Sequence, residues 1–367
     1  MKTEYPQPYA AIIVYRSVSM RKILFTGGGS AGHVIPNVAL MEELISNGKA
    51  DVCYMGTDGI EKSIVAEWKI PYYQISCPKL IRGGGLKAFK QNLAIPFAFR
   101  RAVQQARKGL EVFRPDVVFS KGGYVALPVV FAAKQLGIPC YAHESDYSIG
   151  LANKLSAGKC RKIFTSFPET ATRLKRGEYS GAPIRRSVFI HTRAEARKAW
   201  DIGLRQTVVL IFGGGSGSKA INEAVRKQLK RLTERYVILH VCGKGNVIDC
   251  NVKNYIQTEF IQDMGSAYAC ADVVVTRAGA GTVFELLALK KPSLLIPLAG
   301  QTRGDQAENA AYFQSKGLCR VLNQSRLHLL ADEIEQTVLN DGLKTRLQNS
   351  SFTSGNRKIL QTLLQEL

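Results

Sequence analysis

The feature that most constrains the fold is a glycine-rich loop that occurs twice, each time between an apolar run and a helical pattern. Residues 22–25 lead into the first loop at 26–36, and residues 207–212 lead into the second loop at 213–218, with one helix expected over 219–234. Short apolar runs of this kind are typical of buried parallel strands, and glycines allow a tight turn before a helix. Two such units, half a chain apart, predict two similar doubly wound halves facing one cleft.

Further apolar runs alternate with helical patterns along the rest of the chain. This alternation predicts parallel sheets with helices on both faces, an α/β fold. The predicted strands are 22–26, 52–56, 72–76, 117–120, 140–143 and 162–166 in the first half, and 208–212, 237–242, 256–260, 273–276, 293–297 and 319–322 in the second. The pattern breaks at 179–183, so we place the domain boundary there, giving domains 20–180 and 181–352. Residues 1–19 are an N-terminal extension without an assigned function, for which disorder is one interpretation.

The formal net charge of +21 indicates an anionic partner such as nucleic acid, a membrane surface or a phosphorylated substrate. A solvated basic surface is the alternative interpretation. The eight cysteines are scattered without CxxC spacing, as expected for buried thiols in a reducing compartment. We expect no metal site and no membrane span, because neither a ligand cluster nor a long apolar stretch occurs.

Several candidate functional residues follow predicted strands, where parallel sheets bind ligands. The helix that begins after the first glycine loop suits a phosphate, and His33 at its mouth could accept a proton from a hydroxyl. Residues 121–124 and 143–146 follow two other strands. In the stretch 277–285, a cation and a glycine turn precede a helix, and Glu285 could accept hydrogen bonds from a ribose diol.

Taken together, these motifs resemble those of the MurG family of peptidoglycan glycosyltransferases from residue 21 onward. The motifs that carry the resemblance are 27–36, 120–124, 143–144, 181–185, 259–261, 277–285, 305–306 and 309–310. The resemblance implies a GT-B fold, with a final helix at 353–367 that crosses back onto the first domain. It implies an inverting transfer of GlcNAc from UDP-GlcNAc to MurNAc-pentapeptide on undecaprenyl diphosphate, in peptidoglycan synthesis. It implies no obligatory cofactor, a divalent cation being at most stimulatory.

The same resemblance implies site residues in both halves. The C-terminal half would bind the donor, with Ile261 at the uracil, Glu285 at the ribose, and Gln306 near the sugar. The donor residues are Ser30, Ala31, Gly32, Arg185, Gly215, Ser216, Ile261, Arg277, Ala280, Gly281, Thr282, Glu285 and Gln306. The acceptor and cleft residues are Gly123, Tyr124, His143, Asp146 and Asn153. His33 or Glu144 would be the general base.

Two positions depart from the family pattern. Asp146 stands where the family often has an asparagine, which puts an amide contact to the donor sugar in doubt. Gly215 stands where the family usually has a serine in the second glycine loop, and the neighbouring Ser216 could take that role.

Three alternative functions can be compared with the sequence. A nicotinamide-dependent oxidoreductase would need an acid after the second strand, where Asp58 stands beyond the strand end. A nucleic-acid-binding protein would need aromatic and basic residues interleaved on one face, which the glycine loops lack. A glycosyltransferase with a diacylglycerol acceptor is the nearest alternative.

One segment indicates peripheral attachment to the cytoplasmic face of the cell membrane. Apolar residues at helical spacing lie among lysines and arginines, a pattern typical of an interfacial helix that Pro96 kinks or divides. The membrane candidates are Leu80, Ile81, Lys87, Phe89, Lys90, Leu93 and Phe97. The alternative is that this apolar stripe belongs to the core.

Overall fold

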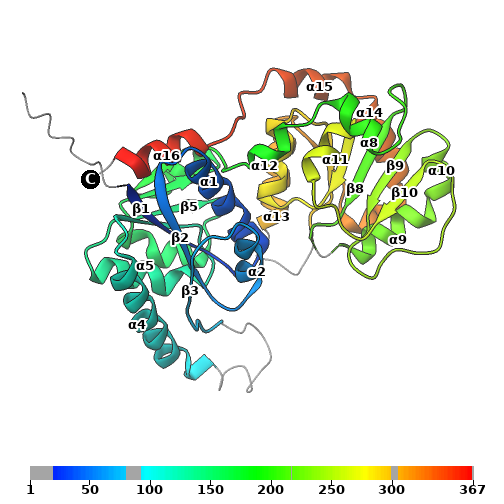
Figure 1. The fold of residues 1–367 in the computed structure, drawn as a ribbon. Helices are drawn as coiled ribbons and strands as arrows, with labels where there is room; N and C mark the ends of the chain where they lie inside the picture. Colours follow the sequence, from blue (N-terminus) through cyan, green and yellow to red (C-terminus); the bar gives the residue numbers. More distant parts are fainter. Residues whose placement is uncertain (1–19, 80–91, 216, 299–304, 366–367) are drawn as a thin grey trace, which may run out of the picture.

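Two all-parallel β-sheets form the framework of the protein and lie in separate lobes (Figure 1). The computed structural model describes residues 20–79, 92–215, 217–298 and 305–365. The extension 1–19 and the predicted membrane residues Leu80, Ile81, Lys87, Phe89 and Lys90 lie outside the described residues, as does Ser216.

The first sheet has seven strands in the order β3-β2-β1-β4-β5-β6-β7. Its strands are β1 (Arg21–Thr26), β2 (Ala50–Gly56), β3 (Tyr72–Gln74), β4 (Val117–Ser120), β5 (Cys140–Glu144), β6 (Lys162–Thr165) and β7 (Gly177–Tyr179). Successive side chains of β1 enter different clusters, since Ile23 packs with α1 and Leu24 packs with α4 and α5. The sheet is therefore buried on both faces, as continuous apolar strands require.

The second sheet has six strands in the order β10-β9-β8-β11-β12-β13. Its strands are β8 (Val208–Phe212), β9 (Val237–Val241), β10 (Tyr255–Thr258), β11 (Val273–Thr276), β12 (Ser293–Leu295) and β13 (Arg320–Val321). Val209 packs with α9, α10 and α14 on one face, whereas Leu210 packs with α11, α12 and α13 on the other. The prediction of two doubly wound sheets is confirmed.

Helices connect the strands in both lobes. The α-helices of the first lobe are α1 (Ile35–Ser46), α2 (Ile60–Ala66), α4 (Ile95–Phe113), α5 (Ala126–Gln135), α6 (Leu151–Ser156) and α7 (Pro168–Thr172). Those that follow are α8 (Arg193–Ala199), α9 (Lys219–Lys227), α10 (Leu229–Thr233), α11 (Met264–Cys270), α12 (Ala280–Ala288), α13 (Asp305–Ser315), α14 (Leu330–Val338), α15 (Asp341–Gln348) and α16 (Asn356–Gln365). Short 3₁₀ helices are η1 (Ala31–His33), η2 (Ala157–Lys159), η3 (Arg186–Phe189) and η4 (Gln324–Leu329).

Several predicted strand ends are displaced by one or two residues, and two elements differ more substantially. The single helix expected over 219–234 is two helices, because Gln228 leaves helical geometry and its side chain bonds Leu327 O and Ala331 N. Strand β7 was not predicted, because its three residues, only partly buried or exposed, carry no apolar run. Pro96 lies in the first turn of α4, where proline is compatible with a helix, and a turn at Ala94 separates α4 from helical residues before it.

The chain crosses between the lobes twice, and the two crossing segments are hydrogen-bonded to each other. Gly355 N donates to Ala182 O at 2.8 Å. The side chain of Asn356 brackets Ile184, accepting from its N at 3.0 Å and donating to its O at 3.0 Å. Helix α16 then packs Ile359 and Leu363 into the core of the first lobe (Figure 1).

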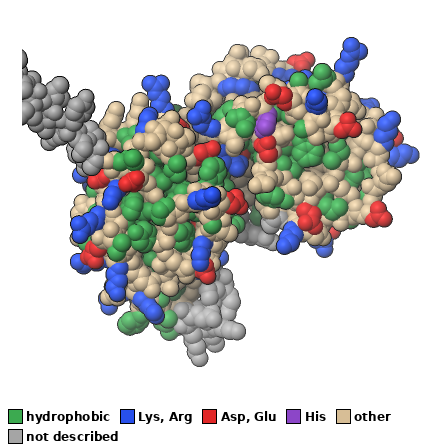
Figure 2. All heavy atoms as spheres, viewed as in Figure 1, with side chains coloured by type: hydrophobic (Ala, Val, Ile, Leu, Met, Phe, Trp, Pro, Cys, Tyr) green, Lys and Arg blue, Asp and Glu red, His purple; other side chains and the backbone are tan. Residues whose placement is uncertain are grey.

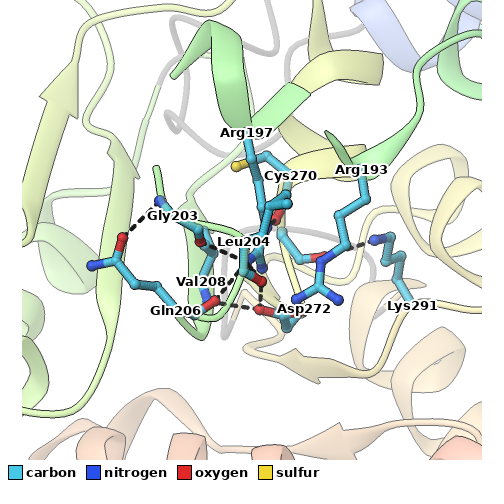
Figure 3. Close-up of polar contacts among 10 residues, drawn as sticks. Arg193, Arg197, Gly203, Leu204, Gln206, Val208, Cys270, Asp272 and Lys291 are labelled. Atoms are coloured by element: carbon cyan, nitrogen blue, oxygen red, sulfur yellow. Dashed lines mark hydrogen bonds and ion pairs between the residues drawn. The ribbon is translucent and has the colours of Figure 1, made fainter. Parts of the chain in front are cut away.

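A buried arginine binds the chain segment that leads into β8, at the end of the second sheet opposite its glycine loop (Figure 3). Arg197 of α8 is inaccessible to solvent and donates to Gly203 O, Leu204 O and Gln206 O. It also pairs with Asp272 at 2.6 Å, whose carboxylate accepts from Val208 N at the start of β8. Each guanidinium nitrogen therefore has a partner, which makes this buried charge tolerable.

Candidate active site

The predicted site residues of the first lobe follow the carboxyl ends of β1, β4 and β5, which are neighbours in the sheet. His33 ends η1, directly before α1. Its Nδ1 lies 3.1 Å from Gly28 O and 3.0 Å from Ser30 Oγ. The exposed residues Ser30 and Gly32 flank Ala31 in this loop, so the loop faces solvent.

The second loop of this lobe approaches the first so closely that only glycine fits. Gly123 has φ +79°, and a Cβ built there would lie 2.4 Å from Gly28 O and 3.1 Å from His33 Nδ1. The ring of Tyr124 lies against Gly29. The structure thus brings His33, Gly123 and Tyr124 together, as the sequence analysis expected of residues at neighbouring strand ends.

The carboxylate of Glu144 is buried, and its hydrogen bonds are made to the residues that directly follow β5. Its Oε1 accepts from Asp146 N at 3.2 Å, and its Oε2 accepts from Gly150 N at 2.8 Å and Asn153 Nδ2 at 2.9 Å. The buried Asn153 also donates to His143 O. Of the two candidate bases, Glu144 is thus buried, whereas His33 is partly exposed.

His143 has no exposed surface, so the structure does not support the expected contact with the acceptor. Its Nε2 lies 3.0 Å from Gly181 O, in the first segment that crosses between the lobes. Burial, and after it the nearby Lys121, lower the pKa of His143, so the ring is neutral. His143 therefore ties strand β5 to the crossing segment.

Asp146 forms a bridge between the lobes. Its Oδ1 accepts from Asn309 Nδ2 at 2.9 Å, and Asn309 Oδ1 accepts from Tyr147 N at 2.9 Å. Burial and, secondarily, the Glu144 carboxylate raise the pKa of Asp146 to about 6. The acid that replaces the family's amide thus contacts α13 of the other lobe.

In the second lobe, Arg277 organises the glycine loop after β8. Its Nη2 donates to Ser218 Oγ at 2.7 Å and to Gln324 Oε1 at 2.7 Å, and its Nη1 donates to Ile296 O at 3.2 Å. Arg277 therefore positions the start of α9, whereas the sequence analysis had expected a donor contact. Gly215 is exposed in this loop, with open space where a Cβ would be.

Glu285 lies on α12, inside the site, and is almost completely buried. Its Oε1 lies 3.4 Å from Arg185 Nη2, and its Oε2 accepts from the buried Tyr268 hydroxyl at 3.0 Å. Burial raises the pKa of Glu285, with Arg185 opposing the shift. The structure therefore joins two predicted donor residues in one ion pair.

Four other predicted donor residues of the second lobe lie on α12 or in its core cluster, and a fifth lies on α13. Ala280, Gly281 and Thr282 form the first turn of α12, and the buried Ile261 packs in the same core cluster as Ala280. Gln306 is turned to its own loop, since its Oε1 accepts from Leu298 N at 3.0 Å. Asp58, the acid that a nicotinamide enzyme would need, is exposed and pairs with Lys62.

The two described membrane candidates are exposed, which contradicts the alternative that they belong to the core. Leu93 is 60% exposed and Phe97 is 75% exposed, and the flanking Arg100 and Arg101 are also exposed. Elsewhere, lysine and arginine side chains are spread over both lobes of the face in view (Figure 2). Within the described residues, no helix has the length and apolar composition needed to cross a bilayer.

Sequence reasoning did not assign a role to several residues of this region. Asn309 was noticed only as part of a motif, and Glu61 and Tyr268 were not noticed. Glu61 lies in the first turn of α2, after the end of β2, and its place in the sequence does not by itself show that it lies beneath the glycine loop. Among the described residues, no group of three or more His, Cys, Asp or Glu side chains is arranged to hold a metal ion.

Comparison with known proteins gives consistent matches over most of the chain. Residues 23–165 match the glycosyltransferase family 28 N-terminal domain, and residues 208–363 match its C-terminal domain. A UDP-N-acetylglucosamine–N-acetylmuramyl-(pentapeptide) pyrophosphoryl-undecaprenol N-acetylglucosamine transferase of Clostridium tetani is 38% identical, covering 94% of this chain and 97% of its own. The protein of that name from Clostridium botulinum strain Alaska E43 is 44% identical, covering 83% and 86%. The crystal structure of Acinetobacter baumannii MurG superposes with a TM-score of 0.73 at 26% identity, covering 95% and 100%.

Proposed function

Since this chain belongs to the MurG family of glycosyltransferases, we propose which of its residues carry out the reaction of that family. The enzyme transfers GlcNAc from UDP-GlcNAc to lipid I, the undecaprenyl-diphosphate-linked MurNAc-pentapeptide, and forms lipid II with inversion at the anomeric carbon. The fold is GT-B. We take residues 20–180 with the returning helix as the acceptor domain and residues 181–352 as the donor domain.

The donor proposal is that the uridine diphosphate binds at the start of α12. Glu285 would accept hydrogen bonds from the ribose diol, and the first turn of α12 would offer its free N–H groups to the diphosphate. Arg185, which is held beside Glu285, supplies a positive charge next to this turn. These groups would stabilise the charge that develops on the departing UDP.

The acceptor proposal is that His33 is the general base. As the acceptor hydroxyl oxygen bonds to the anomeric carbon of GlcNAc, His33 would take the hydroxyl proton. The bond from that carbon to the β-phosphate oxygen breaks, and its electron pair leaves with UDP. The observation that supports this assignment is the orientation of the ring, whose Nδ1 is hydrogen-bonded to the loop.

A variant of His33 tests the proposal. His33→Ala should lower turnover at saturating substrates by at least about a hundredfold, the range of general base catalysis, with UDP affinity nearly unchanged. Steady-state kinetics and calorimetry with UDP measure the two quantities. Wild-type turnover in this variant would show that the base is another residue.

We further propose that the protein binds peripherally to an anionic membrane through Leu93 and the first turns of α4. Exposed apolar side chains beside exposed arginines support an interfacial position, and the acceptor is itself a lipid. Each basic residue near an anionic leaflet contributes about 1 kcal/mol, and salt weakens this term. High salt should therefore release part of the protein from anionic vesicles.

A further inference from the structure

Two hydrogen bonds meet at the peptide unit between Gly28 and Gly29, one at each end. Gly29 N donates to Glu61 Oε2 at 3.1 Å, and Gly28 O lies 3.1 Å from His33 Nδ1. The N–H and the C=O of one peptide are conjugated, so a carboxylate at the N–H makes the C=O a stronger acceptor. We propose that Glu61 is a positioning residue that acts on His33 through this peptide.

The contact with Gly28 fixes the tautomer of His33. A carbonyl oxygen can only accept, so His33 Nδ1 carries the hydrogen and Nε2 carries the lone pair. In the opposite tautomer, two lone pairs would face each other at 3.1 Å. The hydroxyl of Ser30 fits either tautomer and does not decide between them. The peptide therefore holds the ring in the form that a base requires.

The Glu61 side chain lies buried beneath the first glycine loop as a carboxylate. It has no exposed surface, and its three hydrogen-bond partners all donate: Gly29 N, Thr57 N at 3.0 Å and the Thr57 hydroxyl. A carboxylate, which only accepts, matches three donors. A Cβ at Gly28 would lie 2.6 Å from this carboxylate, so the loop is shaped around it.

Among the described residues, Glu61 is the acid that contacts this peptide, and the nearby Asp58 is exposed and paired with Lys62. The titratable groups that face the loop from the neighbouring strand end are Lys121 and Tyr124, and those around the carboxylate are Tyr54, Tyr72, Cys77 and Asp58. Burial lowers the pKa of Lys121 and raises the pKa of Tyr124. Burial also raises the pKa of Cys77 to about 12 and raises the pKa values of Tyr54 and Tyr72, so these three groups stay neutral at physiological pH.

The arrangement is comparable to a carboxylate that orients a catalytic histidine, with a peptide placed between the two groups. As His33 takes the acceptor proton, the ring becomes a cation, and the polarised carbonyl stabilises it. This inference rests on the proposed role of His33 as the base. It adds that Glu61, which lies on α2 outside the cleft, increases the basicity of His33.

The Glu61→Gln variant tests the inference, because an amide cannot accept from all three donors. We expect turnover at saturating substrates to fall at least about tenfold, part of the whole base contribution. The KM for UDP-GlcNAc should stay near the wild-type value, and the acidic limb of the rate profile should move to lower pH. Glu67→Gln, which removes an exposed charge at the end of the same helix, should change neither quantity.

A double variant separates this role from simple support of the fold. If Glu61 acts through His33, Glu61→Gln should lower turnover no further once His33 is alanine. An additional tenfold loss in that background, or an unmoved pH profile in the single variant, would overturn the inference. Wild-type turnover in His33→Ala would instead overturn the base assignment itself. If Glu61→Gln does not fold, Glu61→Asp, whose shorter side chain withdraws from Gly29, must show the same pH shift.

Discussion

The proposed contact of Glu285 with the ribose of the donor leads to a quantitative prediction. The variant Glu285→Ala removes a carboxylate that would accept two hydrogen bonds from the ribose diol. Hydrogen bonds to a charged group contribute roughly 1.5–3 kcal/mol each, so we expect a loss of about 3 kcal/mol. That corresponds to an affinity lower by about 150-fold. UDP and UDP-GlcNAc should lose the same factor, because both carry the ribose.

The same variant should also lower stability. The Tyr268 hydroxyl is buried and donates to Glu285 at 3.0 Å, and within the described residues it has no second acceptor. A buried hydroxyl left without a partner costs about 1–3 kcal/mol. Loss of the neighbouring ion pair with Arg185 is a smaller effect, because the contact is long at 3.4 Å.

Two measurements and one control separate these effects. Calorimetry gives the affinity for UDP, and urea unfolding gives the free energy of unfolding. Tyr268→Phe serves as the control, since it removes the hydroxyl and leaves the carboxylate free to bind ribose; it should lower stability while UDP binding persists. If Glu285→Ala binds UDP within threefold of the wild type, Glu285 does not contact the ribose.

Three further predictions concern stability and membrane binding. Arg197→Met should lower the free energy of unfolding by about 3–5 kcal/mol, because it removes a fully buried guanidinium from Asp272 and from three backbone carbonyls that have it as their donor. In the same urea experiment, Arg193→Met, at a side chain 54% exposed, should cost under about 1 kcal/mol. Asp146→Asn should stabilise the protein by about 1–3 kcal/mol at pH 7.5 and by almost nothing at pH 4. The fold raises the pKa of Asp146 to about 6, so the stability that the protonated side chain contributes at low pH is lost as the pH rises through that value and the side chain ionises. Asparagine does not ionise and avoids this loss. Thermal unfolding at both pH values measures the difference. Leu93→Ser with Phe97→Ser should reduce binding to anionic vesicles without lowering the melting temperature, since both side chains are exposed, and a large fall in melting temperature would assign them to the core.

Much of the fold follows from short-range patterns in the sequence. Strands β4, β8 and β11 have the predicted bounds, because a buried parallel strand is a nearly continuous apolar run that a polar residue or glycine ends. The three-residue strand β7 escaped prediction because it lies at a sheet edge and is not apolar. The break at Gln228 also escaped, because it depends on partners about a hundred residues away.

The candidate site was less predictable than the fold, since a residue type does not show which way a side chain turns. His143 lies near the end of β5 and Arg277 follows β11, where ligand-binding residues are expected, yet both turn toward backbone carbonyls. Their positions near strand ends identified the site. Their hydrogen-bond partners could not be predicted, because those partners are distant in sequence. Glu61 illustrates the opposite case, because a buried carboxylate under a glycine loop is recognisable only once the loop's N–H has been located.

The two glycine loops show how similar sequences acquire different roles. The first loop rests on a carboxylate, Glu61, which occupies the N–H of Gly29 and so withdraws it from any phosphate. The second loop rests on a guanidinium, Arg277, which binds the hydroxyl of Ser218 at the start of α9. A negative charge beneath a loop favours a histidine that must become a cation, and a positive charge favours a diphosphate. The acceptor hydroxyl would therefore be activated at the first loop and the leaving group stabilised in the second lobe, a division of labour set by one charged residue beneath each loop.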